Sequence, residues 1–440
     1  MGGLVFNRGT NVTDAGSLPS YFIAHNPFSA SAPHPVQPSG SPRRPHIVVG
    51  FTSAQTCLVL GSRLRALRDA GFRVTLVSSP GELFTRKAAL EGVESISIPM
   101  RREISPFADL VSLLRMCWML YRLKPEMTEF STPKAGLLGA VAARLCGVPV
   151  RVYMLRGLKL ETSAGLKRRI LLAAEKLASA CSHAVVCNSE SLRNQALALG
   201  LAPKSKLHLL GSGSSNGVDV ERFRPGPSNL RQLLGLPLDA PVVGFVGRMT
   251  RDKGLPELVQ AFDAILAAEP EAQLLLVGWF DAADDALDAD LRCRIRSHPR
   301  IHMTGFVADA APYYRVMDVM VLPTWREGFP NVVLEAAASG IPVVTTLSTG
   351  SRDAVVPGVT GLLVPPGHPA SICKAVLQLL RDPEGRQRMG IAARAWVLEN
   401  YVNGRVLGLA VRYYKGLLEG NRPGEARAIP VPVDSVLNPI

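Results

Sequence analysis

The chain has 440 residues, a length typical of two ordinary domains or one large barrel. Of these residues 47% are hydrophobic and 19% charged, a composition that excludes wholesale disorder. Its apolar runs, such as 272–280, are strand-length and fall short of the ~18 residues that cross a bilayer, so we expect no membrane span. The net charge of +13 lies in residues 1–215, with 26 Lys and Arg against 12 Asp and Glu; residues 216–440 carry 23 against 24.

The basic first half lacks the zinc-knuckle, aromatic and zipper motifs of nucleic-acid-binding proteins, so we expect no nucleic-acid partner. An anionic membrane surface or a phosphate-bearing acceptor fits this charge better, with a merely solvated positive face as the alternative. The seven cysteines form no Cys-x-x-Cys pair, which is typical of reduced thiols in a cytoplasmic protein and predicts no disulfide framework or metal scaffold.

The first half shows alternating strands and helices after a Pro-, Ser- and Gly-rich segment, residues 1–44, that we interpret as a disordered tail. Residues 45–210 form the first predicted domain. Its strands are predicted at 46–51, 73–79, 95–99, 129–131, 150–155, 183–189 and 206–211. A polar loop is predicted at 52–56, followed by a helix that runs to Ala70. Further helices are predicted at 107–123, 134–146, 166–180 and 190–199. Because the strands are continuous apolar runs, they favour a parallel sheet.

A second series follows a predicted interdomain linker at 211–238 and fills 239–400, before a closing helix within 401–420 and a tail at 421–440. Its strands are predicted at 241–248, 273–279, 301–306, 319–324, 342–346 and 361–366. Its helices are predicted at 255–268, 286–297, 308–316, 331–339, 369–381 and 384–400. The predicted fold class is therefore α/β, with two Rossmann-like, doubly wound domains facing across a cleft.

The segment 323–346 carries the strongest functional pattern. Glu327 precedes a tight glycine turn, Asn331 stands where it would cap the next helix, Glu335 lies within that helix and Gly340 ends it. A turn that feeds a helix N-terminus offers backbone N–H groups to an anion or to sugar hydroxyls. The two carboxylates are therefore predicted to grip two parts of a polyhydroxy ligand, unless they are solvated acids at an ordinary helix start.

A second segment, 244–254, carries two cations at positions of interest. Arg248 lies at the C-terminal end of a predicted strand, and Lys253 lies in the loop before the next helix. Ligands of open α/β sheets bind at this strand edge, where two cations can neutralise a diphosphate and stabilise it as a leaving group. An ordinary surface loop is the alternative.

Four motifs, in this order along the chain, resemble the retaining glycosyltransferases of family 4, which have the GT-B fold: GRMTRDKG, LLLVGW, TGFVAD and EGFPNVVLEAAASGIPVV. By this resemblance the donor is a nucleotide sugar, most simply a UDP-sugar, acting as substrate with no metal or other cofactor. Arg248 and Lys253 would hold its diphosphate, Glu327 the transferred sugar and Glu335 the ribose. The remaining donor-binding positions implied by the resemblance are Gly247, Gly278, Gly305, Phe306, Val307, Gly328, Phe329, Pro330, Asn331 and Val332. In this family, retention is attributed to front-side attack with the leaving diphosphate as the base.

The segments 131–157 and 211–219 resemble the branch that builds capsule, exopolysaccharide and glycan-lipid oligosaccharides on polyprenyl-diphosphate-linked acceptors. The acceptor side would comprise Ser53, Gln55, Thr132, Lys134, Arg156, Ser214 and Asn216. The alternative for 132–134 is a helix start with proline in its first turn. The chain departs from the family at 53–56, where many members have a Gly-Gly loop, and at Ser131 or Arg156, where many have a histidine.

Other interpretations remain open. The runner-up enzyme is a nucleotide-sugar 2-epimerase, which shares the fold, and the non-enzyme alternative is a nucleotide-sugar-binding scaffold. A dinucleotide oxidoreductase is disfavoured because no Gly-x-Gly-x-x-Gly follows a strand. Asp288-Ala289-Asp290 spells a metal-binding motif but is not at a strand end, so no metal site is predicted. Trp325 is either the floor of the sugar site or core packing.

The segment 101–124 carries a wide apolar face bordered by Arg101, Arg115 and Arg122, and Lys167-Arg168-Arg169 adds a second basic cluster. The segment is either a peripheral membrane anchor or a helix that faces the core of the first domain. The expected location is cytoplasmic, with the inner face of the membrane as the site of any peripheral contact.

Overall fold

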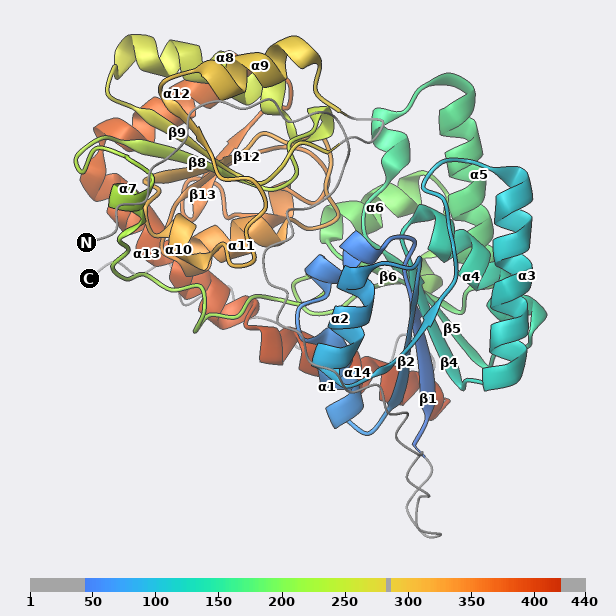
Figure 1. The fold of residues 1–440 in the computed structure, drawn as a ribbon. Helices are drawn as coiled ribbons and strands as arrows, with labels where there is room; N and C mark the ends of the chain where they lie inside the picture. The colour runs from blue at the N-terminus through green and yellow to red at the C-terminus, as the bar shows by residue number, and fades with distance from the viewer. Residues whose placement is uncertain (1–43, 282–285, 421–440) are drawn as a thin grey trace, which may run out of the picture. The chain divides into compact units, whose positions relative to one another are not determined.

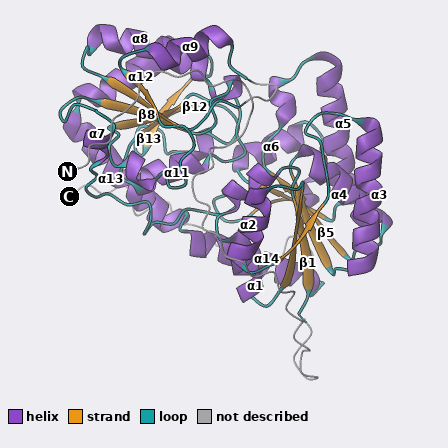
Figure 2. Cartoon of the chain, in the orientation of Figure 1, coloured by secondary structure: helices purple, strands orange, loops and turns teal. Residues whose placement is uncertain are grey.

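The computed structural model describes residues 44–281 and 286–420 and contains two parallel sheets with helices on their faces (Figures 1 and 2). The predicted tail 421–440 and all but the last residue of 1–44 lie outside the described residues. In the first sheet seven strands run in the order β3-β2-β1-β4-β5-β6-β7. Their bounds are β1 His46–Gly50, β2 Arg73–Ser78, β3 Glu94–Ser97, β4 Met127–Ser131, β5 Val150–Leu155, β6 Ala184–Cys187 and β7 Leu207–Leu209.

The helices of the first sheet match the prediction in part. They are η1 Ala54–Leu60, α1 Arg63–Asp69, α2 Glu82–Glu91, α3 Pro106–Leu123, α4 Pro133–Leu145, η2 Lys159–Thr162, α5 Gly165–Cys181, α6 Glu190–Ala198 and η3 Lys204–Lys206. One predicted helix is divided in two, and α2, η2 and η3 were not predicted. The single helix predicted up to Ala70 is wrong: Gly61, with φ +51°, separates a 3-10 turn from α1, and that turn takes in most of the predicted loop. Helix α2 was not predicted, because its polar sequence has no strong apolar stripe.

The second sheet has six parallel strands in the order β10-β9-β8-β11-β12-β13. Their bounds are β8 Val242–Val246, β9 Gln273–Val277, β10 Ile301–Met303, β11 Val319–Leu322, β12 Val343–Thr346 and β13 Gly361–Val364. Its helices are α7 Leu230–Leu233, η4 Arg251–Lys253, α8 Leu255–Ala268, α9 Ala289–Ser297, α10 Ala311–Tyr314, α11 Asn331–Ala338, η5 Arg352–Ala354, α12 Pro369–Arg381 and α13 Pro383–Asn400. The predicted α/β class and doubly wound parallel sheets are confirmed.

The chain passes between the two sheets twice, and the two passages pair. Val218 and Val402 form a parallel bridge, in which Val218 N–H donates to the Tyr401 carbonyl at 2.8 Å and Asn403 N–H donates to the Val218 carbonyl at 3.0 Å. After the second passage, the last helix of the described residues, α14 (Asn403–Leu418), packs on the first sheet. The end of the described chain therefore belongs to the core of its first domain.

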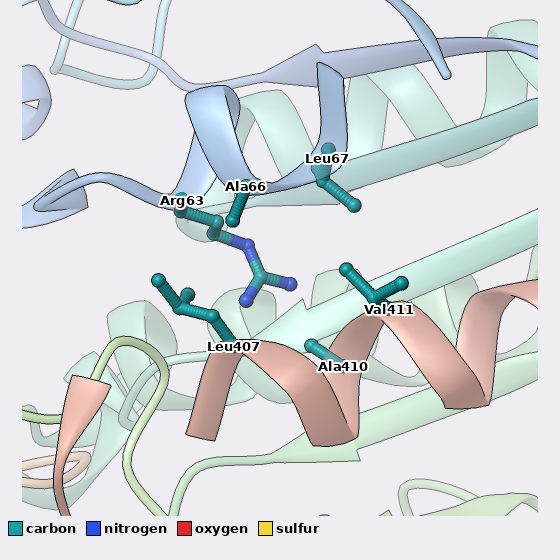
Figure 3. Close-up of a pocket in the computed structure, with 6 residues that line it drawn as sticks. All are labelled: Arg63, Ala66, Leu67, Leu407, Ala410 and Val411. Carbon is teal, nitrogen blue, oxygen red and sulfur yellow. The ribbon is translucent and has the colours of Figure 1, made fainter. Parts of the chain in front are cut away.

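A buried charge network anchors α14 against α1. The guanidinium of Arg63 on α1 is 1% exposed and donates to Glu129 at 2.8 Å and to the Tyr414 hydroxyl at 2.7 Å. Figure 3 shows the apolar walls around Arg63, formed by Ala66 and Leu67 of α1 and by α14 residues that include Leu407. Burial opposes ionisation of Glu129, but the adjacent Arg63 outweighs it and lowers the pKa of that carboxyl. The ion pair therefore stays charged inside the core.

Candidate functional site

The candidate site lies where the strand order of the second sheet reverses. Chain order runs outward from β8 to β10 on one side and from β11 to β13 on the other, so β8 and β11 flank the switch point. Loops at the carboxyl ends of such strands diverge and leave room for a ligand. Arg248 and Lys253 follow β8, and Glu327 follows β11. The topology thus brings together residues that are 74 positions apart in sequence.

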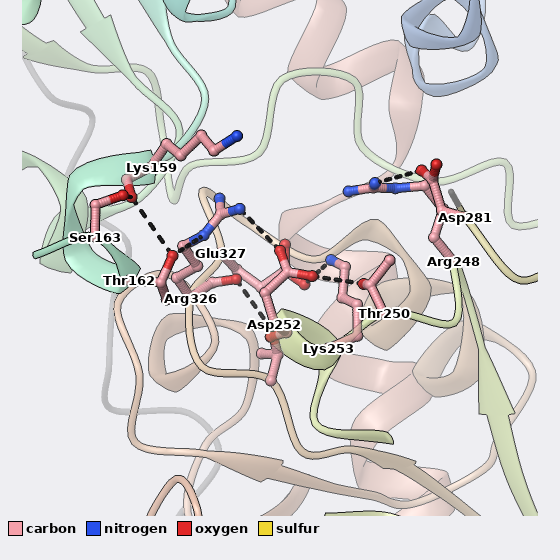
Figure 4. A network of polar contacts seen from close by, with 11 residues as sticks. Lys159, Thr162, Ser163, Arg248, Thr250, Asp252, Lys253, Asp281, Arg326 and Glu327 are labelled. Carbon is pink, nitrogen blue, oxygen red and sulfur yellow. Dashed lines mark hydrogen bonds and ion pairs between the residues drawn. The ribbon is translucent and has the colours of Figure 1, made fainter. Parts of the chain in front are cut away.

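Lys253 and Glu327 form an ion pair at this point (Figure 4). Both side chains are largely buried, at 18% and 14% exposure. Gly254 follows Lys253 with φ +75°, and a Cβ at this position would overlap the carbonyl oxygen of Pro323 on the β11 loop. Only glycine fits this close approach of the two loops without strain. The pair joins the predicted diphosphate cation to the predicted sugar-binding carboxylate.

Asp252 organises the same loops and was not predicted. Its carboxylate accepts from Thr250 and from Arg326 Nη2, the latter at 2.8 Å, while its carbonyl accepts from Trp325 N–H at 2.9 Å. Burial opposes the charge of Asp252, but Arg326 and the Thr250 hydroxyl outweigh it and lower the pKa of the carboxyl. Figure 4 shows Arg326 between Asp252 and Thr162, whose hydroxyl accepts from Arg326 Nε at 3.0 Å. Neither Arg-Asp-Lys-Gly at 251–254 nor Arg-Glu-Gly-Phe-Pro at 326–330 gave a sequence signal for this role of Asp252.

Arg248, the second predicted cation, is paired with Asp281 at 2.8 Å. Burial opposes its charge, but the hydrogen bond to Asp281 and the carboxylates of Asp252 and Glu327 outweigh burial and raise its pKa. Arg102, from the segment before α3, lies 3.8 Å from the same Asp281 carboxylate. Asp281 was not predicted, because it begins the acidic, alanine-rich sequence 281–290, which is typical of a surface loop.

An aromatic pair lies after β9 and β10. The rings of Trp279 and Phe306 meet edge to face with centroids 5.4 Å apart, and Phe306 is 43% exposed. Gly278 bridges to Gly305 and, at φ +151°, lies so close to the Gly247 carbonyl that a side chain would overlap it. These residues lie side by side at the carboxyl ends of β8, β9 and β10. All of them except Trp279 were predicted to bind the donor.

Glu335 accepts a hydrogen bond from the buried Tyr314 hydroxyl at 2.8 Å. Burial raises the pKa of Glu335, against the opposing effect of that hydroxyl. The predicted capping by Asn331 is wrong: Pro330 occupies the cap position, and no side chain caps α11. Because Asn331 is already the first helical residue, its amide oxygen instead accepts from Ser214 at 3.5 Å.

The remaining donor positions differ in exposure. The ring of Phe329 is buried against Tyr401, with centroids 5.3 Å apart, so its side chain belongs to the core. Val332 packs against the same core from a partly buried position. Trp325 is not core packing: it is 42% exposed, and its indole N–H donates to Glu257 at 3.2 Å.

The first sheet has its own switch point between β1 and β4. Thr52 and Thr132 follow these strands, and their hydroxyls lie 2.7 Å apart. Thr132 has φ +71°, a rare and strained conformation for a β-branched residue. Arg156, after β5, donates to Ser215 at 2.9 Å and to Ser131 at 3.2 Å. Burial and the positive charge of a neighbouring arginine lower the pKa of Arg156 to about 10.

The other acceptor positions are spread more widely. Lys134 is turned toward α3, where it pairs with Asp109 at 2.7 Å. Ser53 donates to Gln55 at 2.9 Å in an exposed turn. Ser214 and Asn216 are buried, with Ser214 in a strained turn of φ +63° and Asn216 donating to a carbonyl of η1.

Asp288, from the Asp-x-Asp motif, caps helix α9 by accepting the Leu291 N–H at 2.8 Å. Within residues 44–281 and 286–420, no three His, Cys, Asp or Glu side chains come together as metal ligands. The same described residues include no helix with the length and apolar character needed to traverse a bilayer.

Two family models match the chain. A glycosyl transferase 4-like domain matches residues 59–213, and a glycosyl transferases group 1 domain matches residues 240–382. A relative from Staphylococcus aureus, the capsular polysaccharide biosynthesis glycosyltransferase CapM, is 35% identical over 81% of this chain and 93% of its own. An Escherichia coli relative, UDP-Gal:alpha-D-GlcNAc-diphosphoundecaprenol alpha-1,3-galactosyltransferase, is 25% identical over 66% of this chain and 76% of its own.

Among solved structures, Anabaena HepE in complex with UDP and glucose shares the fold, with a TM-score of 0.70. It is 21% identical, and the match covers 84% of this chain and 98% of HepE. The fold, the matched domains and the Staphylococcus relative agree with one another. The chain belongs to the group 1 glycosyltransferases, the family-4 enzymes of GT-B fold.

Proposed function

We propose that the protein transfers a hexose or N-acetylhexosamine from a nucleotide sugar, expected to be a UDP-sugar, to a lipid-linked or saccharide acceptor in capsule or glycan biosynthesis. The observation that carries this proposal is the Lys253–Glu327 ion pair at the switch point of the second sheet, with Arg248 on the same β8 loop. The CapM relative supports the capsule assignment, and the galactosyltransferase relative supports a diphosphate-linked polyprenol acceptor. The UDP-bound HepE fold supports the choice of nucleotide.

The proposed chemistry begins with charge. Lys253 and Arg248 would bind the donor diphosphate. They would then neutralise the negative charge that develops on the leaving group as the sugar–oxygen bond breaks. Each cation is now paired with a carboxylate, Glu327 or Asp281 respectively, and the donor would exchange with these partners. Glu327, released from Lys253, would then orient the sugar hydroxyls.

We further propose that the anomeric configuration is retained and that no metal is required. Arg248 and Lys253 would offset the diphosphate charge without a metal ion. In the protein without donor, Glu327 pairs with Lys253 and Glu335 accepts from Tyr314, and the proposal gives both carboxylates binding roles instead of the acid and nucleophile roles of a glycosidase pair. The proposed place of action is the cytoplasm, where nucleotide sugars are substrates.

A donor panel tests the proposal. UDP-, GDP- and ADP-sugars are incubated with the purified protein and a crude polyprenyl-lipid extract, with EDTA in a parallel arm, and the released nucleoside diphosphate is measured. We expect release from one donor, unchanged by EDTA, and at least ~100-fold less in Lys253→Ala and Glu327→Ala. Arg294→Ala, which breaks an exposed ion pair with Asp263 elsewhere in the same domain, is the matched control.

The product resolves the rest. Proton NMR of the new glycosidic linkage is expected to show the same anomeric configuration as the donor, and an inverted product would refute retention. Donor epimerised at C2 without transfer would point to the 2-epimerase, whereas tight UDP binding without turnover on any lipid or saccharide acceptor would point to a scaffold.

A further inference from the structure

Helix α3 presents a continuous apolar stripe to solvent. Five large side chains follow one another at spacings of three and four residues, which places them on one helical face. They are Phe107, Leu110, Leu114, Trp118 and Tyr121, with exposures of 81%, 52%, 60%, 63% and 69%. A run of this kind is unusual on a surface that faces only water.

The core side of α3 is already occupied. Ser112, Met116, Met119 and Leu120 are buried, and they pack with α4 against the first sheet. The two readings of this segment, core helix and surface anchor, therefore concern opposite faces of one helix. The core explains the inner face and leaves the outer stripe unexplained, because an ordinary surface helix is polar on its outer side.

Positive charge borders the stripe. Arg115 and Arg122 are exposed on α3 itself, and the Arg122 guanidinium lies 4.8 Å from the centre of the Trp118 ring. Arg101 and Lys124 are exposed beyond the two ends of the helix. The one acidic residue of α3, Asp109, is neutralised by Lys134.

A second basic apolar segment lies on the same side of the sheet. At the start of α5, the exposed Leu166 and Ile170 bracket Lys167-Arg168-Arg169. Helices α3 and α5 both contact α4, and Figure 1 shows α3 at the edge of this helical layer. Apolar side chains and cations thus occur together on two helices that flank a third.

We propose that the outer stripe of α3, together with the first turn of α5, docks on an anionic phospholipid membrane. Apolar and aromatic side chains enter the headgroup region of a bilayer, while flanking arginines and lysines bind lipid phosphates. A second copy of the chain fits less well, because a two-fold contact would bring like-charged arginine borders together. The proposal goes beyond transfer chemistry, since it needs neither donor nor acceptor.

Vesicle co-sedimentation of the full chain tests it. We expect binding to phosphatidylcholine vesicles that contain phosphatidylglycerol, several-fold weaker binding to phosphatidylcholine alone, and weakening by high salt. Leu114→Glu and Trp118→Glu should each reduce the partition coefficient by about tenfold or more. Ile391→Glu is the matched control, because Ile391 on α13 is 64% exposed but lies on a helix of the second sheet. It should bind vesicles like the unchanged protein.

Brominated lipids locate the contact. They should quench part of the tryptophan emission of the bound protein, and Trp118→Phe should keep the binding but lose that quenching. The proposal is overturned if vesicle binding does not depend on phosphatidylglycerol, or if neither glutamate substitution reduces it. The proposal is also overturned if the protein does not bind vesicles and light scattering instead shows a dimer that the same substitutions dissociate. Transfer to a detergent-solubilised acceptor should be unchanged in Trp118→Glu, so a failed docking surface and a failed transferase assignment give different results.

Discussion

Glu175 offers the sharpest test of the energetics of the first domain. This α5 carboxyl is 4% exposed, and its described hydrogen bond comes from the Tyr153 hydroxyl at 2.6 Å. Burial, which the tyrosine only partly offsets, raises the pKa of Glu175 from 4.5 to about 7. The folded state therefore binds a proton that the unfolded state releases between these two values. Stability should fall as the pH rises from about 4.5 past 7.

The magnitude follows from the shift. A difference of about 2.5 pKa units corresponds to about 3 kcal/mol of unfolding free energy lost once Glu175 is ionised in both states. Glu175→Gln removes the charge and keeps an acceptor for Tyr153. We therefore expect it to stabilise the protein by about 2–3 kcal/mol at pH 8.5 and by almost nothing near pH 4.5.

Urea unfolding at a series of pH values measures this difference. Glu399→Gln, at an exposed position of α13, is the control for loss of one carboxylate, and its effect should be small at every pH. Tyr153→Phe should extend the loss of stability to higher pH, because the ionised carboxylate would lose its donor and the pKa of Glu175 in the folded state would rise further. If Glu175→Gln destabilises the protein equally at both ends of the range, the buried-charge argument is wrong.

Two further substitutions probe the site. Gly254→Ala should lower the free energy of unfolding in urea by about 2–4 kcal/mol, because its φ is positive and the added carbon would overlap the Pro323 carbonyl. The control Gly235→Ala, with φ +67° and no atom within 4 Å of the added carbon, should lower it by about 1 kcal/mol, and equal losses would contradict the close approach of the two loops. Tyr314→Phe should weaken UDP binding about three- to tenfold in calorimetry, because Glu335 loses the hydroxyl that orients it, and an unchanged Kd would separate that hydrogen bond from nucleotide binding.

The fold could be predicted because its signals are local. Strands of a parallel sheet are apolar runs, and helices such as α8 and α12 carry strong apolar periodicity and were predicted with their observed bounds. Helix α2 was missed because its apolar residues form no strong stripe, and the break at Gly61 was missed because an isolated glycine inside a helical pattern is often tolerated.

The site divides in the same way. The placement of Arg248, Lys253 and Glu327 at strand ends could be predicted, because the apolar strands before them are recognisable in the sequence. Two carboxylates beside them could not be predicted, because Asp281 meets Arg248, and Asp252 meets Arg326, only where loops that follow different strands pack together. The ion pair of Lys134 with Asp109 could not be predicted for the same reason, because only the folded chain brings Asp109 within reach.

The return of α14 has a consequence for the order in which the protein is made. Glu129 and Arg63 are synthesised early, yet the Tyr414 hydroxyl that completes their network is close to the end of the described chain. While the ribosome is still translating the second domain, the first sheet has an open apolar flank and an incompletely bonded ion pair. The nascent first domain therefore lacks α14 until about 200 further residues have been synthesised after β7.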